Sequence, residues 1–576
     1  MKKILGFLCF TAVICCFPSC QDMLTVDSDR YLTVDKNGLT SGNDSISSIL
    51  GLLTGMQKIG ERYFLFGEMR GDLLNTTDYT PADIRSLSDF TVSDTSAYAN
   101  PRDYYAIINN CNYFISRTSD SISPLATENA VAHAIRAWTY MQIVFNWGKA
   151  SYFTEPLLSV EDTEKDFPVY TIPQMIDALI ADLQPFVGAK YPDYGDIYGL
   201  QSSQIFIPVE VLLGDLYLWR GNSTDDYEQA ATYYANYIDK NNISYALVDM
   251  RSVYWSYDNF LLQNFDKVNP SDAGWTTITY ANSSNTELIS AIEMATTPSQ
   301  GITNKVIGQN ASFNNNNNTY TCTYFEPSGV INNLWDDQVY VLHYVSGAMA
   351  TDYVTMGDLR KWGNCKRVTN GGSYRISNGT GYITGDILTK LYMANNIMLY
   401  RLGLVMLRYA EAVNRAGKPN TAFAVLKYGL DPVTLRDTTR IPRSELADAK
   451  PYITIFNNQK YTNTNSSNSF QGTGIHSRGC GSGTSFNQYY TIGGTTGAPL
   501  TSLSDSIQRV ENMICDELAL ETSFEGNRFQ DLMRIALRRN DPSFLAARVA
   551  AKHVNDYNRV YGLLMDKNNW FLPEKK

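Results

Sequence analysis

Three carboxylates near the C-terminal end of the chain recur every four residues, and this spacing could place catalytic carboxylates or ion pairs on one side of a helix. They are Glu517, Glu521 and Glu525, and further charges follow on the next turns at Arg528, Asp531, Arg534 and Arg538. Glycoside hydrolysis needs two carboxyl groups about 5 to 10 Å apart, one as acid and one as nucleophile or base. Opposite charges at three- and four-residue intervals are instead typical of helical ion pairs. The pattern therefore favours a structural ion network.

The glycine-rich segment GIHSRGCGSG, at 474–483, brings His476, Arg478 and Cys480 within five positions. A Cys–His pair forms a nucleophilic site only when the two side chains lie within hydrogen-bond reach. Spacing along the chain gives no such geometry, and no Gly-x-Ser-x-Gly elbow with suitable flanks occurs. We therefore expect a structured loop here and predict no catalytic residue.

Metal and disulfide chemistry find little support in the sequence. The four histidines stand at no zinc-ligand spacing from one another or from a cysteine. The cysteines after residue 20 are odd in number and irregularly spaced, which does not describe a disulfide framework. We expect them to be mainly buried small hydrophobic residues. One disulfide between two of them is kept as an alternative. They are Cys111, Cys322, Cys365, Cys480 and Cys515. No metal or cofactor is predicted.

The composition describes a large globular protein with a weakly charged surface. Of the 576 residues, 44% are hydrophobic and 18% charged, and the formal net charge is −11. We expect no nucleic-acid partner, because such partners are bound by clustered Lys and Arg, and no such cluster occurs. The 39 tyrosines each offer an apolar face with a hydroxyl edge, which suits sugars, peptides and helix interfaces. We expect most of them to fill helix interfaces.

The N-terminus has the pattern of a secretory signal. Two lysines precede an apolar run at 4–17 that is too short to span a bilayer comfortably, and a small residue stands before Cys20. This resembles a bacterial lipoprotein signal, although its FPSC sequence lacks the usual Leu and Ala or Gly. We expect 1–19 to be the signal peptide, Cys20 to carry lipid and 20–43 to form a tether. A plain secreted protein is the alternative.

Apolar residues recur at helical spacing along much of the remaining chain. One pair of predicted helices combines the small Gly214 with large residues such as Tyr234, which is the packing of a tetratricopeptide hairpin. Extra residues at 222–226 predict a longer turn than in the standard repeat. The helices predicted in the first half span 45–59, 104–115, 128–145, 172–183, 208–220 and 227–238.

A second helical hairpin is predicted far along the chain, at 402–431. An apolar stripe precedes a turn at Gly417 and Pro419, and Pro432 stops the second helix. Glu411 and Arg415 are four residues apart and are expected to pair on the solvent side. Two such hairpins indicate one helical scaffold that is interrupted by insertions.

The segments between and after the hairpins are rich in Asn, Gly, Ser and Thr and show short alternating stretches such as 339–344. We predict a mostly α fold over 44–576, a tetratricopeptide-like helical-pair scaffold (an α-α superhelix) with a large irregular loop-rich insertion and a few short strands. Specificity is expected in the long loops. The scaffold is assigned to about 44–243, 396–432 and 504–545, and the loop-rich insertions to about 244–395 and 435–503.

Five segments carry a resemblance to a known family. They are HAIRAWTYMQIVFNWGKASYFTEPL at 133–157, NTELISAI at 285–292, LRYAEAVNRAGKPNTA at 407–422, EGNRFQDLMR at 525–534 and NNWFLPEKK at 568–576. In this order they resemble the SusD/RagB family of surface nutrient-binding lipoproteins of Bacteroidetes. The chain departs from the family where Glu517-Leu518 replaces the usual Glu-Arg, and where Pro101 replaces a common Trp.

The resemblance implies a non-catalytic binder on the outer face of the outer membrane that passes oligomeric nutrients to a SusC-like TonB-dependent transporter. Glycan is the leading ligand and oligopeptide the second, while a glycosidase and a surface adhesin are alternatives of other classes. The ligand is expected on a loop-built patch where aromatic faces meet polar groups. The candidate residues are Arg70, Asp72, Tyr98, Asn100, Trp255, Tyr257, Trp275 and Trp335, the last with its neighbour Asp336.

Overall fold

The computed structural model describes 42–118, 125–241, 281–304 apart from 284, 324–368 apart from 347, 395–461 apart from 449, 474–481, 488–493 and 502–574. Short pieces at 313–314, 319–320, 375–376, 385–388 and 390–393 are described as well. Most of these residues lie in helices. The predicted class, a helical-pair scaffold with a few short strands, is confirmed.

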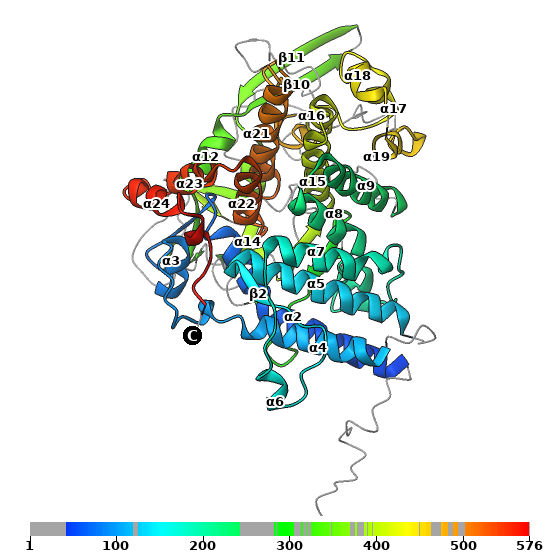
Figure 1. Ribbon diagram of the computed structural model, residues 1–576. Coiled ribbons are helices and arrows are strands. Elements are labelled where there is room, and N and C mark those ends of the chain that lie inside the picture. Colours follow the sequence, from blue (N-terminus) through cyan, green and yellow to red (C-terminus); the bar gives the residue numbers. More distant parts are fainter. Residues whose placement is uncertain are drawn as a thin grey trace, which may run out of the picture.

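The first half of the chain forms a row of helices in which each packs on the next, α2 on α4, α4 on α5, α5 on α7, α7 on α8 and α8 on α9 (Figure 1). All six helices lie where periodicity predicted them, and the bounds of α7 agree with the prediction at both ends. The bounds are α2 (Gly42–Glu68), α4 (Arg102–Thr118), α5 (Ala126–Trp147), α7 (Ile172–Leu183), α8 (Val209–Arg220) and α9 (Thr224–Lys240).

Helix α5 lies in the middle of this row. Every residue from Glu128 to Trp147 is buried, because the helix contacts α2, α4, α7 and α8. Small and apolar residues fill much of this stretch, and a buried polar residue such as Arg136 has partners in Asn112 and Asp182. Gly148, at φ 80°, ends the helix in the left-handed conformation that glycine adopts without strain.

Helices α8 and α9 form the first predicted hairpin. A Cβ atom on Gly214 would lie 2.5 Å from Cε1 of Tyr234, so glycine is needed where the two helices touch. The prediction of a longer turn is wrong, because α9 already begins at Thr224. The Asp226 carboxylate accepts a hydrogen bond of 2.8 Å from the backbone N–H of Asn222, so the additional residues build the start of α9.

The second half of the chain continues the helical body. Helix α15 packs on both α9 and α21, which joins the two hairpins, and α22 packs back on α2. Helices also extend past the predicted limit at 545. The bounds are α15 (Leu402–Arg415), α16 (Pro419–Lys427), α21 (Leu503–Glu521), α22 (Arg528–Arg539), α23 (Pro542–Ala551) and α24 (Tyr557–Leu564).

The predicted solvent-side pair of Glu411 with Arg415 is wrong. Glu411 is 1% exposed and accepts hydrogen bonds from Arg534 at 2.9 and 2.6 Å. Arg415 instead pairs with Glu511 on α21. Because α15 is covered by helices on two sides, its polar residues face neighbouring helices and not water.

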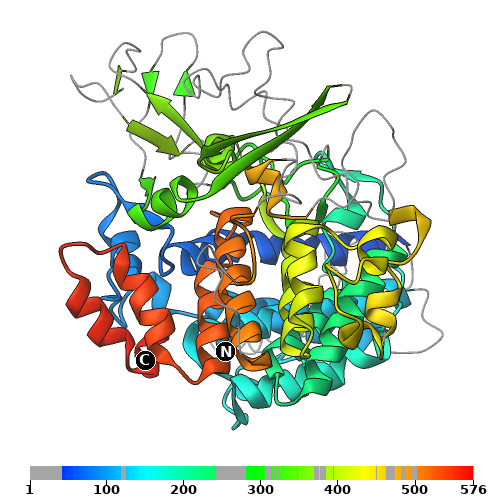
Figure 2. The ribbon, with the colours of Figure 1, turned by 90° about the horizontal axis from the view of Figure 1, so that it is seen from above.

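The strands form small separate sheets in the part of the chain that the structure describes. Strands β6 (Leu288–Ile292) and β15 (Ile397–Arg401) pair antiparallel, and every residue of both is buried. The long hairpin of β10 (Val339–Ser346) and β11 (Met349–Met356) lies on one side of the helical body (Figure 2). Other described pairs join β1 (Leu74–Thr76) to β9 (Phe325–Pro327), β2 (Lys149–Ser151) to β3 (Val169–Thr171), and β12 (Cys365–Val368) to β14 (Gly385–Leu388).

Short helices fill the connections and the irregular lobe. They are α3 (Ala82–Ser88), α6 (Val160–Thr163), α12 (Gly329–Asp336), α13 (Arg360–Asn364), α14 (Lys390–Met393), α17 (Pro432–Arg436), α18 (Arg443–Leu446), α19 (Pro451–Thr454) and α20 (Ser477–Cys480).

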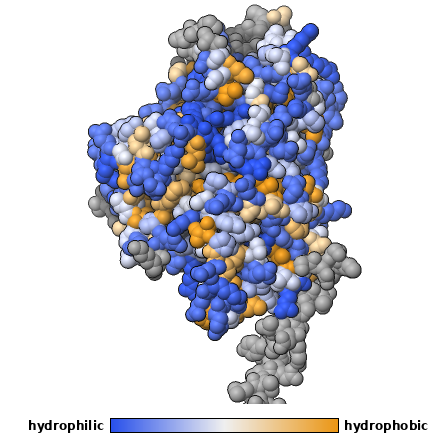
Figure 3. All heavy atoms as spheres, viewed as in Figure 1, coloured by the Kyte–Doolittle hydropathy of each residue, from blue (hydrophilic) through white to orange (hydrophobic). Residues whose placement is uncertain are grey.

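The molecular surface seen in Figure 3 is mostly hydrophilic, with small scattered hydrophobic areas. Among the helices in the described ranges, none has the length and apolar character needed to cross a membrane. Cys111, Cys365, Cys480 and Cys515 are buried, as expected, and Cys322 lies outside the described residues.

Replacing Gly214 by alanine is expected to destabilise the protein by about 1–3 kcal/mol, because the new Cβ would collide with the Tyr234 ring in a closely packed core. Gly51 on α2 is the control, since an added Cβ there meets no atom within 4 Å. Gly51→Ala is expected to stabilise by about 0.5–1 kcal/mol through helix propensity. Thermal unfolding followed by circular dichroism measures both variants. Equal melting temperatures would contradict the packing assigned to Gly214.

Candidate functional site

The three regularly spaced carboxylates lie in the interior and not on a surface. Glu521 accepts hydrogen bonds from Arg401 at 2.8 Å and from Arg478 at 2.7 Å. Glu525 accepts hydrogen bonds from Arg401 and Lys390. The buried ion network to which they belong comprises Glu287, Asp358, Arg360, Lys390, Arg401, His476, Arg478, Glu517, Glu521 and Glu525, whose side chains are at most 3% exposed.

The charges in the buried ion network stabilise one another. Burial by itself raises the pKa of Glu521, but the charges of Arg478, Arg401 and Arg360 outweigh burial and lower that pKa to about 2. The prediction of a structural ion network is therefore confirmed. Its cations, however, come from segments far away in the sequence and not from the following turns of the same pattern.

The segment around His476 is a structured part of this network, as expected. The Nδ1 atom of His476 contacts the Glu517 carboxylate, and its ring stacks on Tyr490 with 3.6 Å between ring centroids. The Cys480 sulfur lies 3.7 Å from Oδ2 of Asp358. Burial raises the pKa of the Cys480 thiol well above its usual range, which disfavours the thiolate that a nucleophile needs.

Three of the predicted ligand residues lie in the core. Arg70 is 1% exposed and donates a hydrogen bond to the Trp570 carbonyl, and Asp72 is 0% exposed and accepts hydrogen bonds from Arg528 at 2.6 and 2.8 Å. Trp335 is also 0% exposed. Their burial is incompatible with direct ligand contact in this structure, so the expectation is corrected for these three residues. Their residue types suit ligand binding, but they suit a buried structural role equally well.

The remaining candidates are placed differently. Tyr98 is half-buried, with its ring packed edge-to-face on Phe66, and Asn100 is half-buried as well. Asp336 forms an ion pair with Lys361 at 2.9 Å. Four predicted residues lie outside the described residues, namely Trp255, Tyr257, Trp275 and the lipidation candidate Cys20.

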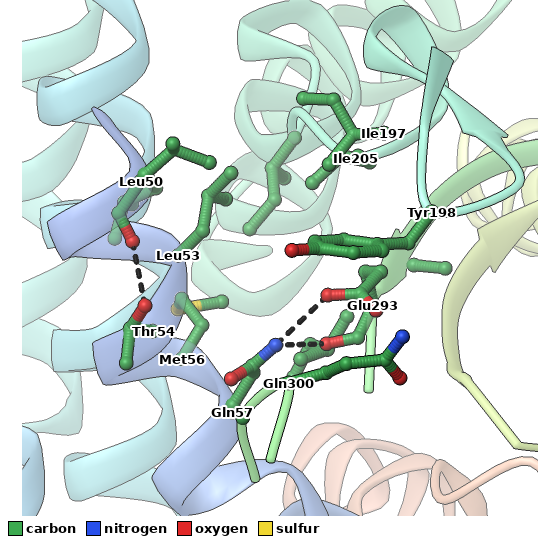
Figure 4. Close-up of a pocket in the computed structure, with 15 residues that line it drawn as sticks. Leu50, Leu53, Thr54, Met56, Gln57, Ile197, Tyr198, Ile205, Glu293 and Gln300 are labelled. Atoms are coloured by element: carbon green, nitrogen blue, oxygen red, sulfur yellow. Dashed lines mark hydrogen bonds between the residues drawn. The ribbon is translucent and has the colours of Figure 1, made fainter. Parts of the chain in front are cut away.

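A pocket of about 250 Å³ lies between the first half of α2, the turn that joins β4 (Asp196–Ile197) to β5 (Leu200–Gln201), and the segment that follows β6 (Figure 4). This is close to the lower end of the range of about 300–1,000 Å³ that small-molecule sites occupy. Its polar groups come from Thr54, Gln57, Tyr198, Glu293 and Gln300, and its apolar wall includes Leu50, Leu53, Met56, Ile197, Ile205 and Ile207.

Tyr198 occupies an unusual backbone conformation at the rim of this pocket. Tyr198 and Gly199 are the two turn residues of the β4–β5 hairpin, with φ values of 50° and 90°. Two positive φ values fit a type I′ turn, whose first position normally holds Asn, Asp or Gly. A bulky residue in this region is strained and costs of order 1–3 kcal/mol. The turn thereby holds a 67% exposed aromatic ring over the pocket.

The polar side of the pocket is fixed by hydrogen bonds. The Gln57 side chain donates to both the carbonyl and the carboxylate of Glu293, at 3.0 and 2.8 Å. Half-burial raises the pKa of Glu293, and the Gln57 hydrogen bond opposes that rise. Gln300 accepts hydrogen bonds from the hydroxyl groups of Thr296 and Thr297, at 2.6 and 3.1 Å.

Sequence reasoning did not identify this site. Gln57 stands in a predicted helix and Glu293 directly after the family segment at 285–292, and neither position carries a signal of ligand binding. The Tyr-Gly pair at 198–199 was the one available signal, because a glycine after an alternating pair of residues predicts a hairpin turn. That signal identifies a turn but not the cavity beneath it.

The described architecture is that of a tetratricopeptide-like helical protein with an irregular lobe and a surface pocket. Residues 217–571 match the sequence profile of the SusD family. The match covers more than half of the chain, which therefore belongs to the SusD family, as its sequence segments predicted. No curated protein matches the chain.

Several solved structures have a similar fold. A SusD superfamily protein of Bacteroides vulgatus aligns with a TM-score of 0.57 and 14% identity, covering 94% of this chain and 97% of that one. A SusD superfamily protein of Bacteroides thetaiotaomicron aligns with a TM-score of 0.52 and 15% identity, covering 94% of this chain and 96% of that one. NanU of Bacteroides fragilis aligns with a TM-score of 0.51 and 15% identity, covering 90% of this chain and 94% of that one. At such low sequence identities, the structural similarity shows only that the fold is shared.

Replacing Arg401 by methionine is expected to destabilise the protein by about 3–5 kcal/mol, because Glu521 and Glu525 would stay buried with less compensating charge. Arg559→Met is the control, since Arg559 forms an exposed pair with Asp556 and such pairs contribute at most about 1 kcal/mol. Thermal and urea-induced unfolding measure both variants. An Arg401→Met protein as stable as the control would refute the role given to the buried ion network.

Proposed function

We propose that this protein is a cell-surface lipoprotein that binds oligomeric nutrients, glycans first among them, and delivers them to a SusC-like TonB-dependent transporter. Membership of the SusD family supports a nutrient-binding surface protein that works with such transporters. The observation that carries the proposal is the exposed Tyr198, in a strained backbone conformation, above a pocket that Gln57, Glu293 and Gln300 help to line.

The chemistry of the pocket suits a sugar. The CH face of a pyranose packs on an aromatic ring, while its hydroxyl groups exchange hydrogen bonds with amide and carboxylate groups. Gln57, Glu293 and Gln300 supply such groups beside Tyr198 (Figure 4). The cavity has room for one unit of an oligomer, so the rest of a longer ligand would lie outside it. Oligopeptide is the second cargo, because a peptide can use the same polar groups.

The proposed location is the outer face of the outer membrane, with Cys20 as the lipid anchor. The N-terminal sequence pattern supports this location. A single chain end tethered by lipid and a polar linker would leave the folded domain able to move relative to the membrane. That freedom is what a binding protein needs if it hands its cargo to a transporter.

Tyr198→Ala is expected to weaken the binding of an oligosaccharide ligand by about tenfold, because removal of the ring removes its packing surface, worth about 1.4 kcal/mol. Tyr557→Ala on α24 is the matched control, since Tyr557 is 37% exposed and lies outside the pocket. Isothermal titration calorimetry against panels of oligosaccharides and oligopeptides measures both. If Tyr198→Ala binds every ligand as tightly as the control does, the site assignment is wrong.

Affinity purification of the tagged protein from detergent-solubilised outer membranes is expected to recover a TonB-dependent transporter of the same cell. A Cys20→Ser variant is expected to leave the membrane fraction, because it lacks the residue that would carry lipid. Mass spectrometry identifies the recovered protein, and cell fractionation locates the variant. Recovery of no transporter would contradict the delivery role while leaving nutrient binding intact.

A further inference from the structure

The pocket beside Tyr198 has two chemically distinct sides. In Figure 4, Leu50, Leu53, Ile197 and Ile205 lie on one side, and Gln57, Glu293 and Gln300 lie on the other. The Tyr198 ring stands between them at the rim. A ligand group that fills this space must therefore offer both an apolar part and hydrogen-bonding atoms.

On the polar side, the side chains of Gln300 and Glu293 offer one hydrogen-bond donor and one acceptor to a ligand. The carboxamide oxygen of Gln300 already accepts from Thr296 and Thr297, which turns its NH₂ group into the donor available to a ligand. One carboxylate oxygen of Glu293 accepts from Gln57, which leaves the other as an acceptor. A planar amide, with one C=O and one N–H, matches this pair.

The charge of the pocket also limits the ligand. None of the described residues that line it is Lys, Arg or His, and its ionisable carboxylate is Glu293. An acidic sugar would meet that carboxylate without a cation to compensate it, and the burial of an uncompensated charge is costly. The pocket is therefore suited to a neutral group.

We propose that this pocket recognises the acetamido group of an N-acetylated amino sugar, an inference that rests on the nutrient-binding function proposed above. The Gln300 NH₂ group donates to the acetamido carbonyl, and Glu293 accepts from the acetamido N–H. The methyl group packs against Leu53 and Ile205. An unsubstituted hexose would place a hydroxyl group against this apolar wall, which is unfavourable without a hydrogen-bond partner.

The position of Tyr198 favours a sugar over a peptide. The residue is 67% exposed, and its ring lies over the pocket, where it offers a flat surface to a ligand. A pyranose ring that packs there can direct the acetamido group on its second carbon into the cavity. A peptide amide has chain on both sides, and the chain would have to pass through a cavity of about 250 Å³.

Isothermal titration calorimetry of the purified protein tests the inference with three probes. N,N′-Diacetylchitobiose and cellobiose share the same linkage and differ in carrying acetamido or hydroxyl groups, and N-acetyl-dialanine methylamide represents a peptide. The diacetylated sugar is expected to bind at least about tenfold more tightly than the other two, a difference of about 1.4 kcal/mol. Equal binding of the two sugars, tighter binding of the peptide, or binding of none of the three would overturn the inference.

Two variants test whether the preference for the acetylated sugar depends on this pocket. Gln300→Glu replaces the donor by an acceptor at an exposed position and is expected to reduce the preference for the acetylated sugar to about threefold or less. Gln459→Glu makes the same change at an exposed residue outside the pocket and is expected to leave the preference unchanged. An unaltered preference in Gln300→Glu would refute the site.

The outcomes also separate the two proposals. If other glycans bind and their binding depends on Tyr198, the nutrient-binding proposal survives without the acetamido inference. If no glycan or peptide binds, the nutrient-binding proposal and the acetamido inference both fail.

Discussion

The structure depends on pairing several buried charges far from water. Each ion of the buried ion network would be costly to bury alone, and the cost is offset only when all partners are in place. Its members come from regions as distant in sequence as Glu287, Arg401 and Glu521, which meet within hydrogen-bond distance. The network thus joins residues of the loop-rich insertions, such as Arg360 and Arg478, to residues of the helical scaffold, such as Glu521.

Strand β6 connects this network to the candidate binding site. Glu287 precedes β6 and accepts hydrogen bonds from Arg478, while Glu293 follows β6 and lies in the pocket. The strand is buried and pairs with β15, whose last residue is Arg401. Five residues of buried strand separate the two ends. The strand therefore has one end at the buried ion network and the other at the pocket, where Gln57 also holds Glu293 by hydrogen bonds of 3.0 and 2.8 Å.

The opposite side of the pocket is positioned by different means. Its apolar wall belongs to α2 and to the segment around Ile205, and Ile205 packs in a small separate hydrophobic cluster with Leu200 and Ala291. Tyr198 is held by a two-residue turn in a strained conformation, and the paired strands β4 and β5 maintain it. Strain of this kind persists where the surrounding structure fixes it, and it is frequent at binding sites. The pocket thus combines an apolar wall with one exposed tyrosine whose backbone conformation costs free energy.

Local patterns in the sequence determined the helices, because side-chain periodicity and capping act within a few residues. Helix α7 and the hairpin of α8 and α9 follow from such patterns, and so does the close contact at Gly214. Family segments spread along the chain were sufficient to predict the SusD family. The structural role of the carboxylates at 517–525 was also predicted, although the predicted pairing at helical spacing is replaced by pairs with distant residues.

Only the tertiary structure decided which partner each polar residue has. Glu411 binds Arg534 and not its helical neighbour Arg415, and Arg70, Asp72 and Trp335 are core residues despite types that suit ligand binding. Gln57, Tyr198 and Glu293 form one site although they lie far apart in sequence. The physical reason is the range of the forces involved. Periodicity reports which face of an element is apolar, whereas hydrogen bonds and ion pairs depend on distances that exist only after the elements have packed.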